Sequence, residues 1–126
     1  MKLPFVVNDG DSRTRFDFIE LSASGTAKRQ STPEHAMLWW QVTRSQPSHR
    51  YQWTSDEPRF IAVFSGQLNI YTSDARMLCF ARGDMLVLDH KCASMVIAIA
   101  SGIERCEILT IALDPARFSE LTSGRK

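Results

Sequence analysis

The sequence predicts an all-β protein, a sandwich or barrel of short strands that ends in a short helix. Apolar runs recur about every eight to twelve residues, and turns rich in Gly, Ser or Asp separate them. Only residues 116–121, near the end of the chain, have helical character. The length of 126 residues fits a single domain that spans residues 1–126.

The predicted strands follow a turn cluster at residues 8–11, and most have alternating apolar residues or strong β composition. They cover residues 16–21, 37–43, 59–64, 67–72, 77–80, 85–88, 93–100 and 105–113. Residues 21–33 lack periodicity, and we expect a surface or partner-facing loop there. Gly66 lies in the two-residue turn between two of the strands and predicts a β-hairpin. Asp114 and Pro115 are typical of the N-cap and first position of a helix, which we expect over residues 116–121.

The charge balance excludes several classes of partner. Fifteen Lys and Arg residues against fourteen Asp and Glu give a net charge of +1, and the basic residues are scattered. This pattern gives no basic patch for a nucleic acid, and the chain has no apolar run long enough to span a membrane. We expect the partner to be a small molecule or another copy of the chain.

The cysteines indicate a reducing compartment. Cys79, Cys92 and Cys106 are odd in number and lack CxxC spacing, and no apolar signal segment precedes Asp9. We therefore expect a cytoplasmic protein with reduced thiols, in which each cysteine is a small buried apolar residue.

Several short segments together resemble one family. They are DGDSR at residues 9–13, GQLNI at 66–70, TSD at 72–74 and FARGDMLVLD at 80–89. In this order they resemble the small single-domain cupins over most of the chain. The resemblance implies a double-stranded β-helix, a small antiparallel barrel with a cavity at one mouth.

The chain departs from the cupin pattern at the metal-binding positions. A Glu or Gln is expected seven residues before the glycine that corresponds to Gly66, and Arg59 is there instead. The family's histidines would fall among residues 52–55 and 94–96, none of which is histidine, and the chain's His35, His49 and His90 are scattered. The resemblance thus implies a cupin that has lost its histidine triad, and we expect no metal and no other cofactor.

Arg59 is the first candidate for the site. It shares a strand face with Ile61 and Val63, and in the family that face points into the barrel. A buried guanidinium needs a carboxylate, such as that of Asp56 or Glu57, or an anionic or carbonyl group from a ligand. We interpret Arg59 as the anchor of a substrate.

A second group of candidates would supply acid-base chemistry. His49, Tyr51 and Trp53 alternate and would share one face of a strand over residues 49–53. His49 could transfer a proton near neutral pH, Tyr51 could donate to an oxyanion, and Trp53 could contact the substrate. His90 is the alternative catalytic histidine.

The remaining candidates would bind substrate. Asp89 lies beside His90, where the family has an acidic pair, although adjacent residues on a strand point to opposite faces. Trp39 is the more favourable of two adjacent tryptophans to face inward, with Met37 and Gln41, although the opposite register is nearly as plausible. Met95 is the third candidate for substrate binding. The simplest role for the apolar side chains of Trp39 and Met95 is packing in the core or in an interface.

These observations favour a metal-independent enzyme acting on a small organic molecule with a carbonyl or carboxylate. Isomerisation, cyclisation or dehydration all fit, with catalytic residues His49, His90 and Tyr51. The alternatives are a non-catalytic binding or sensing domain and a metal-dependent cupin dioxygenase. The resemblance also implies a homodimer, and a short chain with several large aromatic residues favours one.

Overall fold

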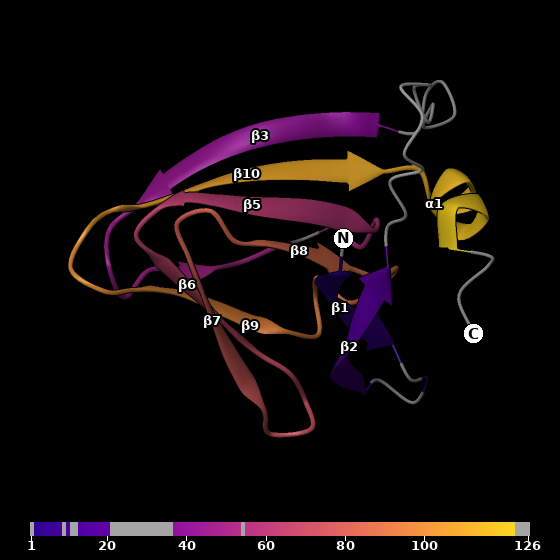
Figure 1. Cartoon of the computed structure of the whole chain (residues 1–126), viewed down its shortest axis with the longest axis horizontal. Coiled ribbons are helices and arrows are strands. Elements are labelled where there is room, and N and C mark those ends of the chain that lie inside the picture. The colour runs from indigo at the N-terminus through magenta and orange to yellow at the C-terminus, as the bar shows by residue number, and fades with distance from the viewer. Residues whose placement is uncertain (1, 9, 11–12, 21–36, 54, 123–126) are drawn as a thin grey trace.

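The computed structural model describes residues 2–8, 10, 13–20, 37–53 and 55–122. These residues form two antiparallel-rich sheets that face each other, with a short helix at one end (Figure 1). The predicted loop at residues 21–33 and the residues 9, 11, 12 and 54 lie outside the described part of the chain. The prediction of an all-β barrel with a short C-terminal helix is confirmed.

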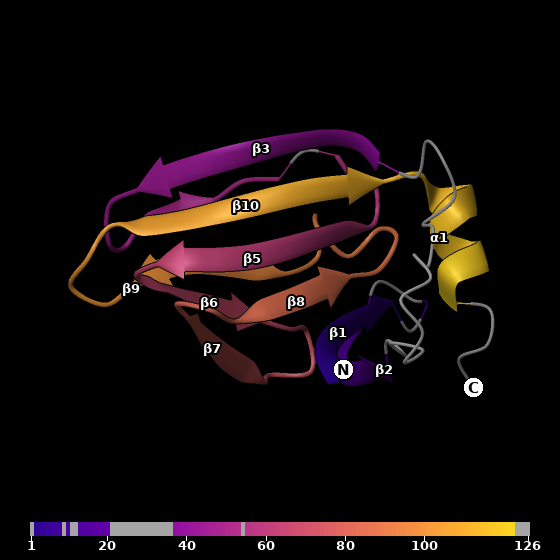
Figure 2. The same ribbon diagram turned by 45° about the horizontal axis from the view of Figure 1, so that its top comes forward.

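The larger sheet has six strands in the order β2-β1-β8-β5-β10-β3 (Figure 2). They are β1 (Lys2–Asn8), β2 (Thr14–Glu20), β3 (Met37–Ser45), β5 (Arg59–Ser65), β8 (Met85–Leu88) and β10 (Cys106–Leu113). The smaller sheet has four strands in the order β4-β9-β6-β7. They are β4 (Arg50–Tyr51), β6 (Gln67–Tyr71), β7 (Met77–Ala81) and β9 (Ile97–Ser101).

The main core lies between the sheets and follows from the alternation of side chains along each strand. Ile61 and Val63 from the larger sheet pack with Leu68 and Ile70 from the smaller one, and all four are buried. Burial of each such side chain stabilises the fold by roughly 1.5–3 kcal/mol. Strand β10 shows the alternation most clearly, since every second residue from Cys106 is buried.

A second core cluster lies where the helix α1 (Pro115–Thr122) meets the N-terminal strands. Phe118 of α1 packs on Phe5 of β1, with ring centroids 5.9 Å apart. Asp114 caps the helix as predicted, since its carboxylate accepts the Ala116 amide at 2.9 Å. Among the described residues, no helix is long and apolar enough to cross a membrane.

The predicted hairpin at Gly66 is wrong. Strands β5 and β6 do not pair, because β5 lies between β8 and β10 while β6 lies between β7 and β9. Gly66 has a φ of +70°, and the chain passes from one sheet to the other there. A tight glycine turn between two β runs also fits such a sheet-switching corner.

The largest other differences from the predicted strands concern residues 93–96 and β1. Residues 93–96 form a turn and not a strand, because the amides of Met95 and Val96 both donate to the carbonyl of Cys92. Strand β1 was not predicted, and it extends the larger sheet by parallel pairing of Phe5 with Val87. That pairing joins residues far apart in the sequence, so no local pattern indicates it.

Candidate functional site

The candidate site is built on one cross-strand row of the larger sheet. Ala112 pairs with Trp39 on one side and with Arg59 on the other, and Arg59 pairs with Leu88. Residues directly opposite each other in antiparallel strands share a face, so all four lie on the inner face. Ala112 is fully buried and small. Because the Ala112 side chain is small, the side chains of Trp39 and Arg59 on either side of it can contact each other.

Arg59 is held between two indole rings inside the barrel. Its side chain is 1% exposed, and its guanidinium carbon lies 5.4 Å from the ring centroids of Trp39 and Trp53. Arg59 Nη2 donates to the carbonyl of Ser55 at 2.7 Å and to its hydroxyl at 3.1 Å. Arg59 Nε is also buried, and it has no hydrogen-bond partner among the described residues. Burial lowers the pKa of Arg59, and the charges of Glu57 and Asp56 oppose that effect.

Glu57 brings a carboxylate to the same cluster. Its Oε2 lies 3.8 Å from Arg59 Nη2, which is an ion-pair contact. In the part of the chain that the structure describes, this buried oxygen has no hydrogen-bond partner. Hydrogen bonds from the Ser55 hydroxyl and from its own backbone amide lower the pKa of Glu57, and the charge of Arg59 and the Trp39 indole add to this. The site therefore holds a cation, an anion, one unpaired donor and one unpaired acceptor.

The predicted row of His49, Tyr51 and Trp53 exists, although only Arg50–Tyr51 within it is a strand. The His49 ring meets Tyr51 edge-on at 5.0 Å between centroids, and Tyr51 stacks on Trp53 at 5.9 Å. Trp53 in turn contacts Arg59. His49 is exposed and Tyr51 is buried. The imidazole thus lies at the outer end of the row, separated from the guanidinium by two rings.

The phenol of Tyr51 is bonded within the protein. Its oxygen forms hydrogen bonds with the Ser45 hydroxyl and with the Cys106 thiol. Ser45 ends β3, the edge of the larger sheet, and Tyr51 lies in β4, the edge of the smaller one. These side chains therefore join the two sheet edges where the backbones do not pair.

Burial raises the pKa of Tyr51 above its ordinary value, and this gives a prediction for alkaline pH. Above about pH 10 an unfolded tyrosine ionises while folded Tyr51 keeps its proton, so stability is lost as pH rises. Tyr51→Phe should make the free energy of unfolding less dependent on pH above 10, and should cost about 1 kcal/mol at neutral pH. Urea unfolding at several pH values measures both effects.

Tyr71→Phe is the matched control, because Tyr71 is an exposed tyrosine on β6. It should leave the stability at neutral pH unchanged. An equal change of slope in the two variants would contradict the buried environment of Tyr51.

Asp89, His90 and Met95 lie in the turns that follow β8. The Asp89 carboxylate accepts the backbone amide of His90 at 2.7 Å, and His90 is exposed. The carboxylate therefore holds the turn, and the pair does not form an Asp-His dyad through the imidazole. Met95 is partly buried, and its amide bonds to Cys92. These turns lie beside residues 55–58, the segment that carries Ser55 and Glu57, since the Lys91 amide donates to the Asp56 carbonyl at 2.8 Å.

The register of β3 places the two tryptophans on opposite faces. Trp39 points inward as predicted, and Trp40 points outward with 62% of its surface exposed. Met37 does not share the inner face, because a bulge at Leu38 makes it pair with Leu113. Gln41 lies at the exposed sheet edge.

The donor set of the described residues does not fit a transition metal. At the position where the resemblance to the cupins implies a carboxylate ligand, Arg59 is a buried cation between two indole rings. Within the described ranges, no three His, Cys, Asp or Glu side chains converge on one point.

The two facing sheets and their strand orders define the class as a double-stranded β-helix, the barrel fold of the cupins. The Salinispora arenicola cupin 2 conserved barrel domain protein has a TM-score of 0.52 and 15% identity, over 68% of this chain and 71% of that one. A double-stranded β-helix protein from Klebsiella pneumoniae has a TM-score of 0.50 and 13% identity, over 75% and 91%. These likenesses show the fold.

ToxT from Vibrio cholerae is also similar, with a TM-score of 0.54 and 11% identity. The match covers 71% of this chain and 34% of the ToxT chain, so this chain spans about a third of that protein. No protein-family model and no curated protein matches the sequence.

The sequence indicated Glu57 only as a possible carboxylate partner of Arg59. It did not indicate that Ser55, Ser45 and Ala112 contribute to the site. Glu57 precedes Arg59 by two residues, and this same-face spacing was the available signal. Ser55 lies in a segment without regular structure, and Ala112 matters only through its cross-strand partners.

Proposed function

We propose that this chain is a binding or sensing cupin domain that holds a small carbonyl-bearing organic molecule at Arg59. The observation that carries the proposal is the buried guanidinium between Trp39 and Trp53 with an unpaired Nε–H. A buried donor without an acceptor costs free energy, and a ligand carbonyl would satisfy it. The two indole rings would pack on the apolar or planar body of the ligand.

The neighbouring carboxylate narrows the chemistry of the ligand. Glu57 Oε2 is a buried acceptor 3.8 Å from Arg59 Nη2, and no described residue donates a hydrogen bond to it. A ligand that accepts from Arg59 and donates to Glu57 satisfies both groups. Carboxamides and hydroxy ketones can do this, whereas a simple carboxylate meets repulsion from Glu57. We therefore favour a neutral carbonyl compound with an adjacent donor.

Binding without turnover is supported by where the acid-base groups lie. His49 and His90 are exposed, and the phenol of Tyr51 is bonded to Ser45 and Cys106. A general acid or base must reach the proton that it transfers within hydrogen-bond distance or through one water. These three predicted catalytic residues do not converge on Arg59, and this favours the alternative of a binding domain.

One observation keeps a metal-independent enzyme as the second candidate. The unpaired Glu57 oxygen and the unpaired Arg59 N–H lie in one cluster, as a base and an oxyanion donor would in an isomerase. The low pKa of Glu57 weakens it as a base at neutral pH, so we place this reading second.

Native mass spectrometry of ligand binding tests the proposal. The probes are benzamide, salicylamide and benzoate, which share a ring and differ in the polar group. We expect the amides to bind wild type more tightly than benzoate, and we expect Arg59→Met to weaken amide binding by about 10-fold or more. Equal binding to wild type and Arg59→Met, or no binding by any probe, would reject Arg59 as the anchor.

The same samples separate binding from catalysis. Each probe recovered unchanged after long incubation supports the binding domain. Conversion that Glu57→Gln abolishes would favour the enzyme instead.

A further inference from the structure

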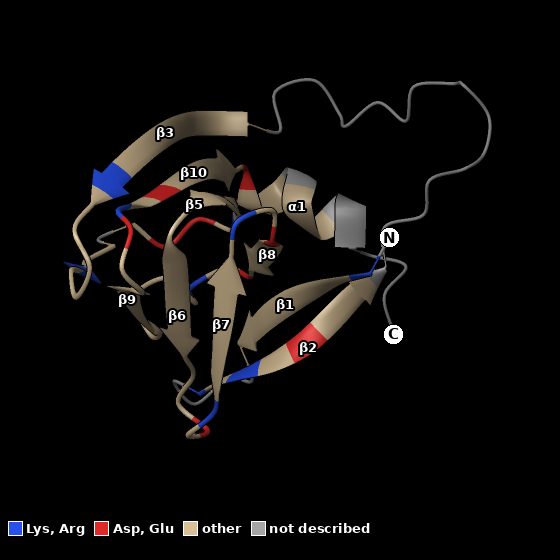
Figure 3. Ribbon diagram, turned by 60° about the vertical axis from the view of Figure 1, so that its left-hand side comes forward, with Lys and Arg blue, Asp and Glu red and all other residues tan. Residues whose placement is uncertain are grey.

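Arg59 is the only buried charged residue in the part of the chain that the structure describes. The strands of the smaller sheet give it no opposite charge, since Figure 3 shows β6, β7 and β9 without Lys, Arg, Asp or Glu. The negative charges that act on Arg59 belong to Asp56 and Glu57. Residues 55–58, just before β5, therefore supply the polar surroundings of the guanidinium.

Ser55 is the residue of this segment that contacts the guanidinium directly. Its carbonyl oxygen and its hydroxyl oxygen both accept hydrogen bonds from Arg59 Nη2, at 2.7 Å and 3.1 Å. The same hydroxyl donates to the carboxylate of Glu57. A carbonyl with a hydroxyl on the second carbon from it thus accepts from the cation and donates to the anion.

Ser55 satisfies only part of the hydrogen-bonding capacity of these two side chains. Arg59 Nε and Glu57 Oε2 are buried, and neither has a hydrogen-bond partner among the described residues. A buried donor and a buried acceptor without partners each cost free energy. A molecule that makes the bonds of Ser55 and also reaches these two atoms would therefore bind in preference to Ser55.

Ser55 can leave the guanidinium while the rest of the segment stays in place. Among the described residues, its hydrogen bonds go to Arg59 and Glu57. The segment is anchored one residue further on. There the Asp56 carbonyl accepts the Lys91 amide at 2.8 Å, and the Asp56 carboxylate accepts a second backbone amide at 3.2 Å. Exchange of Ser55 for a ligand leaves both anchors intact.

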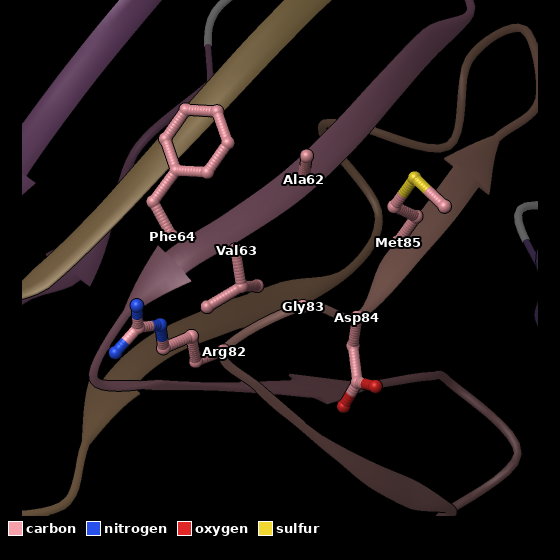
Figure 4. A pocket seen from close by; sticks show the side chains of 7 residues that line it. All are labelled: Ala62, Val63, Phe64, Arg82, Gly83, Asp84 and Met85. Atoms are coloured by element: carbon pink, nitrogen blue, oxygen red, sulfur yellow. The ribbon is translucent and has the colours of Figure 1, made fainter.

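A hollow on the outward side of β5 makes no comparable selection of a ligand. Its volume is about 420 Å³, and Figure 4 shows Phe64 and Met85 around it with Arg82 and Asp84 at its lower edge. The Asp84 carboxylate accepts the Ala81 amide at 2.8 Å and so closes the turn. None of the residues that line this hollow has a buried side-chain polar atom without a partner. The observations therefore favour the Arg59 site.

We infer that Ser55 is an internal substitute for the ligand, and that the site takes 3-hydroxy carbonyl compounds, which bind Arg59 in place of Ser55. This rests on the function proposed above, and it adds the spacing of the two polar groups and the residue that the ligand displaces. The carbonyl of such a compound accepts from Arg59 and its hydroxyl donates to Glu57, as the same groups of Ser55 do. A carboxamide of this kind also supplies N–H donors for Glu57 Oε2.

Two isomeric probes test the spacing. In 3-hydroxy-4-phenylbutanamide the hydroxyl has the same position relative to the carbonyl as in serine, and in 4-hydroxy-4-phenylbutanamide it lies one carbon further away. Both probes carry the same ring and the same amide. Titration of wild type by ligand-observed NMR should give a dissociation constant about 5-fold or more lower for the 3-hydroxy isomer. Equal binding, or tighter binding of the 4-hydroxy isomer, would overturn the ligand class.

Ser55→Ala tests the displacement. It removes the hydroxyl that competes with the ligand and keeps the backbone carbonyl, so the 3-hydroxy isomer and benzamide should both bind about 5-fold more tightly than to wild type. Ser55→Thr keeps a hydroxyl and should bind both probes as wild type does. If Ser55 only holds the site together, Ser55→Ala should bind the probes more weakly or equally, and the inference is then wrong.

Ser94→Ala is the matched control. Ser94 is exposed and contacts the same segment through its backbone amide, which donates to the Asp56 carboxylate and which the substitution keeps. It should leave the dissociation constants of all probes unchanged. Near-UV circular dichroism checks that each variant is folded. If Ser55→Ala does not fold, the comparison of the two isomers on wild type decides the question.

Failure of this inference can be told apart from failure of the proposed function. If benzamide binds wild type and loses affinity in Arg59→Met, the carbonyl site stands. Equal binding of the two isomers, or no gain of affinity in Ser55→Ala, then rejects the role of Ser55 alone. If no amide binds wild type, the proposed function and this inference are both rejected.

Discussion

Arg59→Ala should destabilise the fold by about 3 kcal/mol or more, although arginine is a charged residue. The side chain is fully buried, so its removal leaves a cavity between Trp39 and Trp53 and leaves Glu57 without its ion-pair partner. Urea unfolding at neutral pH measures the loss. A variant as stable as wild type would contradict the buried position of the guanidinium.

Arg59→Met separates packing from charge. Methionine fills much of the same volume and makes favourable contacts with aromatic rings, so we expect it to restore most of the stability. The remaining loss in the free energy of unfolding should become smaller when Glu57→Gln is added to Arg59→Met, because the carboxylate without an ion-pair partner is then removed. We expect both variants to stay folded while lacking the guanidinium, so they also keep the binding test interpretable.

Gly66→Ala is the other change for which we expect a large effect. A Cβ at this position would lie 2.6 Å from the Arg105 carbonyl oxygen and 2.8 Å from Cys106 Cα, and both are backbone atoms that cannot rotate away. The φ of +70° adds about 1–2 kcal/mol for any residue with a Cβ. We expect a total loss of about 3 kcal/mol or more in urea unfolding.

Gly83→Ala isolates the conformational part of that cost. Gly83 also has a positive φ, of +91°, but a Cβ there would meet no atom within 4 Å. It should lose about 1–2 kcal/mol, clearly less than Gly66→Ala. Equal losses would mean that the close approach between Gly66 and the start of β10 contributes nothing.

Local sequence patterns predict most strands of this barrel because alternation decides which side chains are buried. Strand β10 is a clear case, and β8 was predicted with its observed bounds. The pairing partners were not predictable in the same way. The glycine turn at Gly66 fits either a hairpin or a sheet-switching corner, and the choice depends on a backbone contact with Arg105, distant in sequence.

The candidate site was predictable in part for a similar reason. Period-two alternation placed Arg59 on the inner face, and the contacts with Trp39 and Trp53 join three residues that reasoning had named separately. His90 and Asp89 were named by their position in the family pattern, and the turn directs the Asp89 carboxylate to a backbone amide. Side-chain direction within a turn depends on local backbone angles, which residue type alone does not determine.

The arrangement of the tryptophans gives the molecule two independent optical signals. The chain has three tryptophans, and Trp39 and Trp53 flank the guanidinium while Trp40 lies on the outward side of β3 with 62% of its surface exposed. In a Trp40→Phe variant, the fluorescence should report on the surroundings of Arg59 inside the barrel. In a Trp39→Phe and Trp53→Phe variant, the emission should come from Trp40 and report on the solvent along the outward side of the larger sheet. The interior of the barrel and its outward surface can therefore be followed separately in the same solution conditions.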